Sequence, residues 1–87
     1  MGMTPIYFRE GGLAFGWFSN ESGEPAPVHV FKGKDRSTSA KFWLNEDGPE
    51  LAHNKARLSD RELRIAYAHI NANRYRLMAR WLSQFGA

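Results

Sequence analysis

The chain has 87 residues, enough for one domain over residues 1–87 but not for a large core. It contains no cysteine, which excludes disulfide bridges and thiolate zinc sites, and no apolar run approaches the ~18 residues of a membrane span. The net charge of +3 is unevenly distributed, because no acidic residue follows Glu62. This basic C-terminal part would attract a polyanion or an acidic partner protein. The explanation that we favour is that Arg76 and Arg80 only complement the negative end of a helix dipole.

The first half of the chain has the pattern of a β-sheet. Residues 5–10 and 13–18 form strand-like runs around Gly11 and Gly12, which predicts a hairpin. Residues 19–27 are polar and rich in Pro and Gly, as in a surface loop. Residues 28–32 and 38–44 predict two further strands. After a loop at residues 45–50, residues 51–57 fit either an irregular segment, a helical turn or a short fifth strand near residues 50–55.

The last third of the chain predicts a helix. Ser59 and Glu62 have the spacing of a capping box, and neither Pro nor Gly follows before Gly86. We expect one helix of about 25 residues, with a break near residues 71–73 as the alternative. Its apolar stripe comprises Leu63, Tyr67, Ile70, Leu77, Trp81 and Phe85. The predicted fold is therefore α+β, a four- or five-stranded, largely antiparallel sheet on one long C-terminal helix.

The helix should cover only one face of this sheet. We expect Leu63, Tyr67, Ile70 and Trp81 to contact Phe15, Val30 and Phe42 on that face. Strand alternation then leaves a second face without a partner in the chain, made of Tyr7, Phe18, His29, Phe31, Lys41 and Trp43. Aromatic and basic side chains together suit a protein interface, which we favour, or a nucleic-acid surface. The third explanation is that loops cover this face and make it ordinary core.

The candidates for chemistry are few. The three histidines, His29, His53 and His69, match no metal-ligand spacing, so no metal is expected, and no cofactor motif is present. His29 is the candidate acid or base for RNA cleavage, with Lys41 and Arg36 as phosphate ligands. Phe31 or Trp43 would stack on a base. Lys32 and Arg74 complete the set of predicted nucleic-acid or partner-binding residues.

Several of these motifs together resemble a known bacterial family. The segments "EPAPVHVFKG", "AKFWL" and "LAHNKARLSDREL", followed by Asn73, Leu77, Trp81 and Phe85, are similar to the family catalogued as domain of unknown function 4160. Many members carry His-x-His-Val, where this chain has Pro27 and keeps only His29. The resemblance implies no established activity. It does imply a component of a toxin–antitoxin-like pair, which an obligate partner would complete.

These observations lead to two functional expectations. The first is a small interaction protein in a toxin–antitoxin-like pair, with a partner protein or a second copy on the second face. A second copy could instead pack on Ala68, Ala72 and Ala79. The alternative is an RNA-binding protein or metal-independent ribonuclease that uses His29. No membrane or small-molecule cofactor is expected, and the N-terminus lacks a charged leader and an apolar run, which predicts a cytoplasmic protein.

Overall fold

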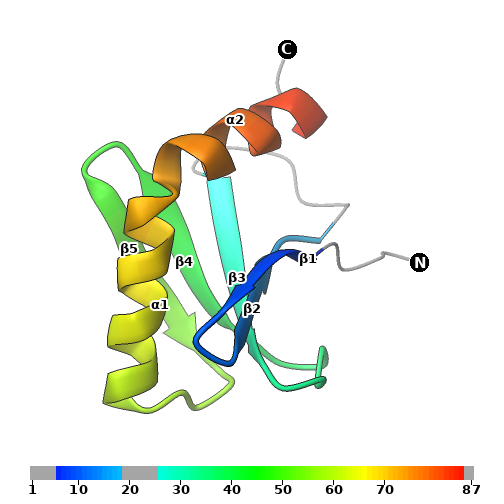
Figure 1. The fold of residues 1–87 in the computed structure, drawn as a ribbon, viewed down its shortest axis with the longest axis vertical. Helices are drawn as coiled ribbons and strands as arrows, with labels where there is room; N and C mark the ends of the chain where they lie inside the picture. Colours follow the sequence, from blue (N-terminus) through cyan, green and yellow to red (C-terminus); the bar gives the residue numbers. More distant parts are fainter. Residues whose placement is uncertain (1–5, 19–25, 86–87) are drawn as a thin grey trace.

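The fold begins with a meander of five antiparallel strands (Figure 1). The computed structural model describes residues 6–18 and 26–85. It does not describe the side chains of Tyr7 and Phe85, so the expectations for these two side chains lie outside the described part. The strands are β1 (Ile6–Glu10), β2 (Leu13–Gly16), β3 (Ala26–Lys32), β4 (Ala40–Asn45) and β5 (Gly48–Asn54), and they follow one another across the sheet in chain order. The α+β prediction is confirmed, and the ambiguous segment is the fifth strand.

The C-terminal part is two helices, so the expectation of one long helix is wrong. Helix α1 (Asp60–Ala72) and helix α2 (Arg74–Phe85) meet at Asn73, whose φ of −109° and ψ of 12° leave the helical region. The Asn73 amide group donates to the carbonyl oxygen of His69 at 2.8 Å, a local bond that competes with regular helix. A straight helix of this length would span about 38 Å, and the longest dimension of the chain is 36 Å.

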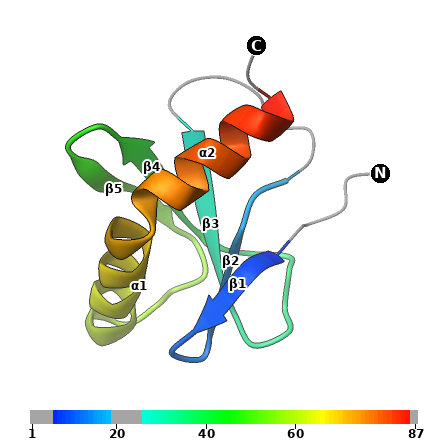
Figure 2. The same ribbon diagram turned by 45° about the horizontal axis from the view of Figure 1, so that its top comes forward.

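The break changes which part of the sheet each helix covers. Helix α1 lies beside β4 and β5, and α2 turns across the other strands (Figures 1 and 2). Both helices lie on the same face of the sheet. The predicted start of α1 is confirmed, because Ser59 and Glu62 form a capping box in which each side chain accepts the other residue's backbone N–H.

The core lies between the helices and one face of the sheet. Phe15, Val30 and Phe42 are buried there together with Ile70 and Trp81, and Trp81 is only 3% exposed. The prediction that Ile70 and Trp81 of the apolar stripe face the sheet is therefore confirmed.

Tyr67 departs from the predicted stripe, since it is 44% exposed. It lies near the edge of the sheet, where its hydroxyl approaches the β4–β5 turn at Gly48. The core position on this part of α1 is taken by the smaller Ala66, which is fully buried.

The second face of the sheet is partly covered by the chain itself. Phe31 is fully buried and His29 is 6% exposed, so the expectation that this face lacks an internal partner is wrong for both residues. The β3–β4 connection contributes to the cover, because the Arg36 guanidinium lies 5.1 Å from the centre of the Phe31 ring. From the same connection, Ser39 hydrogen-bonds to His29. Among the described side chains of this face, Phe18, Lys41 and Trp43 remain partly exposed.

Candidate functional site

A row of three basic side chains crosses the second face of the sheet. The register pairs His29 of β3 with Lys41 of β4, and Lys41 with His53 of β5. Residues directly opposite each other on neighbouring strands project to the same face. Lys41 therefore lies between two imidazoles that come from the strands on either side. We call these three residues the His–Lys–His row.

His53 reaches this row because β5 contains a bulge. Phe42 pairs with Leu51, but the next pair is Lys41 with His53, so Ala52 is an extra residue on β5. A bulge of this kind shifts the alternation of the strand by one residue. Without it, Ala52 would lie opposite Lys41. The site therefore depends on a local irregularity of the edge strand.

His29 is held in a fixed position within the row. Its Nδ1 lies 2.7 Å from the Oγ of Ser39, a distance typical of a strong hydrogen bond. Its ring lies 4.7 Å from that of Phe18 and is stacked near Phe31 at 6.1 Å. The small residues Ala14 and Gly16, opposite Phe31 and His29 on β2, leave space for these rings. The hydrogen bond to Ser39 fixes the orientation of the imidazole ring.

His53 has a different electrostatic environment. Burial lowers its pKa, and the positive charges of Lys55, His29 and Lys41 lower it further. Its Nδ1 is buried and has no hydrogen-bond partner among the described residues. The neutral imidazole is therefore the main form at neutral pH, and this form can accept a proton.

The cations of the second face lie over aromatic rings. The Lys41 Nζ is 4.4 Å from the centre of the half-buried Trp43 ring, and Arg36 lies over Phe31. Arg36 also donates to the carbonyl oxygen of Gly33 at 2.9 Å. Because Phe31 is enclosed, its ring is not available to stack on a nucleic-acid base. Trp43 keeps part of its surface accessible.

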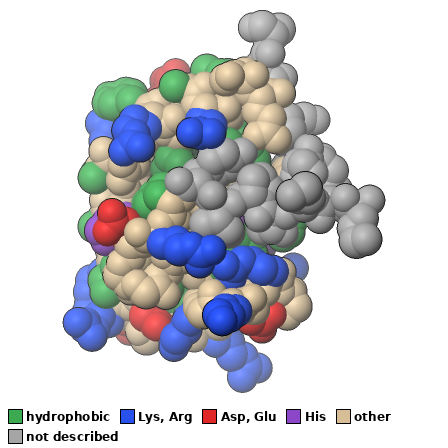
Figure 3. Space-filling model, turned by 45° about the vertical axis from the view of Figure 1, so that its right-hand side comes forward, with side chains coloured by type: hydrophobic (Ala, Val, Ile, Leu, Met, Phe, Trp, Pro, Cys, Tyr) green, Lys and Arg blue, Asp and Glu red, His purple; other side chains and the backbone are tan. Residues whose placement is uncertain are grey.

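Two of the predicted binding residues lie on the helix side of the sheet. Lys32 forms a 2.9 Å ion pair with Glu62 of α1. Arg74 lies at the start of α2, where its guanidinium bonds to Asn71 and covers the ring of Tyr75. The structure thus groups His29, Arg36, Lys41 and Trp43 and separates Lys32 and Arg74 from them. In Figure 3 the visible Lys and Arg side chains lie in an upper and a lower area of the surface.

Sequence reasoning did not include His53 among the site residues. The sequence did contain one signal for the position of β5, the turn "NEDG". Asn45 and Gly48 pair across this turn, so β5 runs back along β4. Counting residues outward from the pair of Asn45 and Gly48 places Ala52 opposite Lys41. The bulge places His53 there instead. His69 does not join the row, because it lies on the helix side with its ring 6.2 Å from that of Phe15.

Among residues 6–18 and 26–85, no three His, Asp or Glu side chains lie close enough together to hold a metal ion. Neither described helix is long and apolar enough to cross a membrane.

Comparison with known protein families gives one match. A family model described as a domain of unknown function (DUF4160) covers residues 12–82. The chain belongs to the DUF4160 family. The match extends from the β1–β2 turn into α2, so the His–Lys–His row and the break at Asn73 both lie inside the DUF4160 domain. No curated protein and no solved structure matches the chain significantly.

Proposed function

We propose that this DUF4160 protein binds single-stranded RNA on the second face of its sheet and cleaves it without a metal ion. The observation that carries the proposal is the His–Lys–His row, in which two imidazoles flank an ammonium group. Metal-independent RNA cleavage requires a proton acceptor, a proton donor and a cation for the phosphate.

The different environments of the two histidines suggest their roles. His53, with its lowered pKa, is suited to take the proton from the ribose 2′-hydroxyl. The 2′-oxygen then attacks phosphorus, and the bond from phosphorus to the 5′-oxygen breaks. His29 would supply the proton to that oxygen, with its ring oriented by the hydrogen bond between Nδ1 and Ser39. The products are a 2′,3′-cyclic phosphate and a 5′-hydroxyl end.

Lys41 and Arg36 would hold the phosphate groups. Lys41 lies between the two histidines, where its charge can stabilise the extra negative charge that develops on the phosphate during attack. Arg36 lies at the side of the row, over Phe31. The exposed part of Trp43 offers a surface on which a base can stack.

The test is cleavage of a single-stranded RNA oligonucleotide in the presence of EDTA. We expect the wild-type chain to release 2′,3′-cyclic phosphate ends, and His29→Ala and His53→Ala each to lower the rate at least ~100-fold. Lys41→Ala should weaken RNA binding as well as cleavage, and binding should weaken as salt concentration rises. His69→Gln and Lys34→Ala are matched controls away from the row and should change little.

Two results would refute this proposal. One is the absence of RNA binding at low salt by the folded wild-type chain. The other is cleavage that survives in both His29→Ala and His53→Ala, since this would indicate a contaminating ribonuclease.

A second candidate function is binding of a partner protein in a toxin–antitoxin-like pair. It is favoured by large apolar side chains that remain exposed outside the second face, namely Leu51, Tyr67, Leu82 and Tyr75, the last of which is 77% exposed. Three of them lie on the helices, so the helices rather than the predicted sheet face offer the more apolar surface.

Sedimentation of the purified chain separates two forms of this second candidate. If a second copy is the partner, the apparent mass should rise with concentration, and Ala72→Glu should return it to the monomer without loss of helix signal. Ala72→Gln is the uncharged control. A monomer at all concentrations would rule out the second copy and leave a different protein as the partner.

A further inference from the structure

A carboxylate lies next to the His–Lys–His row on the second face of the sheet. The register pairs Glu50 of β5 with Trp43 of β4, so both side chains project to the face that carries Lys41. Trp43 follows Lys41 by two residues along β4, a step of about 6.6 Å. This step is comparable with the spacing of consecutive nucleotides in an extended strand. An acid at this place repels phosphate, so its presence beside the row is explained only if it has another role.

Glu50 is held in place by Asn45, which lies on the same face of β4. The side-chain amide nitrogen of Asn45 donates to the Oε1 atom of Glu50 at 2.8 Å. A carboxylate has about four acceptor positions, and this bond uses one of them. Because Glu50 is exposed, the other acceptor positions are accessible to a ligand.

Guanine is the RNA base that fits a carboxylate best. Its Watson–Crick edge carries two adjacent donors, N1–H and N2–H, which can bind the two oxygens of one carboxylate. Adenine and cytosine each present one donor beside an acceptor nitrogen, and uracil presents one donor between two carbonyl oxygens. In these three bases an acceptor faces the carboxylate, and this repulsion selects against them.

We propose that Glu50 makes the second face selective for guanine, with the base stacked on Trp43 and its N1–H and N2–H groups donating to the Glu50 carboxylate. In the free chain the Lys41 ammonium lies 4.4 Å from the centre of the Trp43 ring. In the complex it moves to the phosphate, and the base takes its place over the ring. This inference rests on the proposed RNA cleavage and names the base preference of that site.

The bulge decides which nucleotide carries the selected base. Glu50 and His53 are three residues apart on β5, and they share a face only because Ala52 is the extra residue between them. His53 would take the proton of a ribose 2′-hydroxyl, so the base beside it on Glu50 belongs to the same nucleotide. Cleavage is therefore expected on the 3′ side of guanosine.

The alternative is that Glu50 only braces the β4–β5 turn through its bond to Asn45. Glu50→Gln separates the two roles. The amide keeps the Oε1 acceptor for Asn45, but it replaces Oε2 by an NH₂ group that cannot accept from guanine. Since Glu50 is exposed, the variant should fold.

The probes are the 3′-monophosphates of guanosine, adenosine, cytidine and uridine, titrated into the isotope-labelled full chain and followed by NMR. We expect guanosine 3′-monophosphate to bind at least ~10-fold more tightly than the others, as two paired hydrogen bonds imply. Inosine 3′-monophosphate, which lacks the N2 amino group, should bind with intermediate affinity. The indole N–H signal of Trp43 should shift, while those of the buried Trp17 and Trp81 serve as internal controls. In Glu50→Gln the preference for guanosine should disappear.

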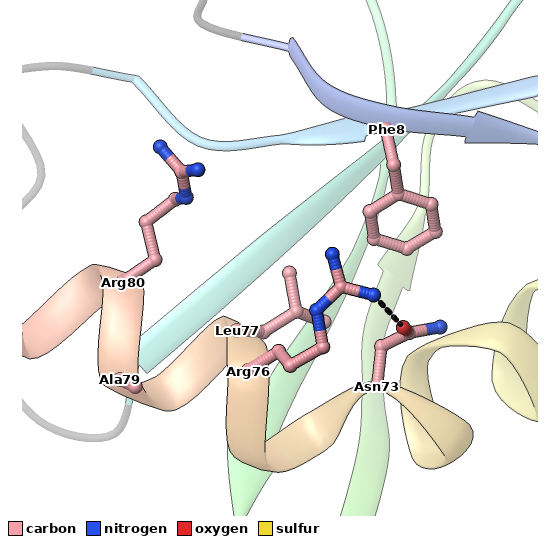
Figure 4. Close-up of a pocket in the computed structure, with 6 residues that line it drawn as sticks. All are labelled: Phe8, Asn73, Arg76, Leu77, Ala79 and Arg80. Atoms are coloured by element: carbon pink, nitrogen blue, oxygen red, sulfur yellow. Dashed lines mark hydrogen bonds between the residues drawn. The ribbon is translucent and has the colours of Figure 1, made fainter.

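The rival site for the phosphate of these probes is a pocket between α2 and β1, which we call the α2 pocket (Figure 4). It lies on the helix side of the sheet, has a volume of about 250 Å³ and is lined by Phe8, Asn73, Arg76, Leu77, Ala79 and Arg80. Arg76 donates to the side-chain oxygen of Asn73 at 3.1 Å. Arg76→Gln is the matched control and should change the affinity for guanosine 3′-monophosphate less than about twofold.

The outcomes separate this inference from the proposed cleavage. Cleavage of RNA at equal rates after all four bases would overturn the guanine preference and leave the cleavage standing. Selective binding of guanosine 3′-monophosphate without RNA cleavage would support the base site and refute the cleavage. A guanosine preference that survives in Glu50→Gln, shifts confined to α2, or no binding of any of the four nucleotides would each overturn the inference.

Discussion

Lys41 and His53 lie opposite each other across β4 and β5, although an unbroken register would place Ala52 opposite Lys41. The bulge at Ala52 thus brings a second imidazole to the same lysine as His29. Because the three side chains are close together, the protonation of His53 should depend on the other two. This dependence can be measured without any substrate.

The pKa of His53 should lie below the ordinary histidine value, because burial and three neighbouring positive charges oppose its protonation. Lys41→Gln removes one of these charges and should raise the pKa of His53. Lys34→Gln, on an exposed turn, should leave it unchanged. NMR titration of the imidazole Cε1–H signal gives the pKa in each variant. An unchanged His53 pKa in Lys41→Gln would contradict the proximity of the two side chains.

The same pKa shift should make stability depend on pH. Since the folded-state pKa of His53 is lowered, the unfolded chain takes up a proton here first as the pH falls through 6.5. The free energy of unfolding should therefore decrease between pH 6.5 and the lower folded-state pKa. Urea unfolding at a series of pH values measures this decrease. In His53→Gln the decrease should be smaller, and an unchanged pH dependence would show that other groups cause it.

The β1–β2 turn should be sensitive to substitution at one of its two glycines. Gly11 and Gly12 both have positive φ, which strains any other residue. A Cβ at Gly11 would also lie 2.9 Å from the Cγ2 of Ile65, whereas a Cβ at Gly12 would meet nothing within 4 Å. Gly11→Ala should therefore destabilise the chain by at least ~1 kcal/mol more than Gly12→Ala. Urea unfolding compares the two, and equal losses would mean that α1 does not restrict the turn.

The capping box should contribute measurably to the stability of α1. Ser59→Ala removes the oxygen that accepts the Glu62 backbone N–H at 3.1 Å. We expect a loss of about 1 kcal/mol in the free energy of unfolding, as is usual for an N-cap. Ser83→Ala, at an exposed position inside α2, is the control and should change stability by less than ~0.5 kcal/mol. The same small effect in Ser59→Ala would show that the cap is not formed in solution.

Trp81 should be the aromatic residue of α2 that matters most for stability. It is 3% exposed in the core, whereas Tyr75 on the same helix is 77% exposed. Trp81→Ala should cost about 3–5 kcal/mol, and Tyr75→Ala should cost less than ~0.5 kcal/mol. Unfolding followed by circular dichroism measures both. If Trp81→Ala does not fold, Trp81→Phe should still lower the midpoint, and an unchanged midpoint would contradict burial of Trp81 in the core.

Some features of this protein could be predicted from the sequence because they are set by residues close together in the chain. The capping box needs only Ser59 and Glu62, and the first hairpin needs only a Gly pair between two apolar runs. The strand alternation also separated Val30 from His29, and Phe42 from Lys41, correctly. The buried position of Trp81 followed from helical periodicity, since the same face meets the core before and after the break.

Other features depended on contacts between distant parts of the chain. Helix propensity predicts that residues 60–85 continue unbroken, but the side chain of Asn73 and the limited size of the sheet favour a turn there. Alternation predicts an open second face, but Arg36 and Ser39 fold back onto Phe31 and His29. The His–Lys–His row and the α2 pocket each need partners from separate strands or helices. No local pattern encodes the bulge that brings His53 to Lys41, because a one-residue shift in pairing is decided by the packing of the whole sheet.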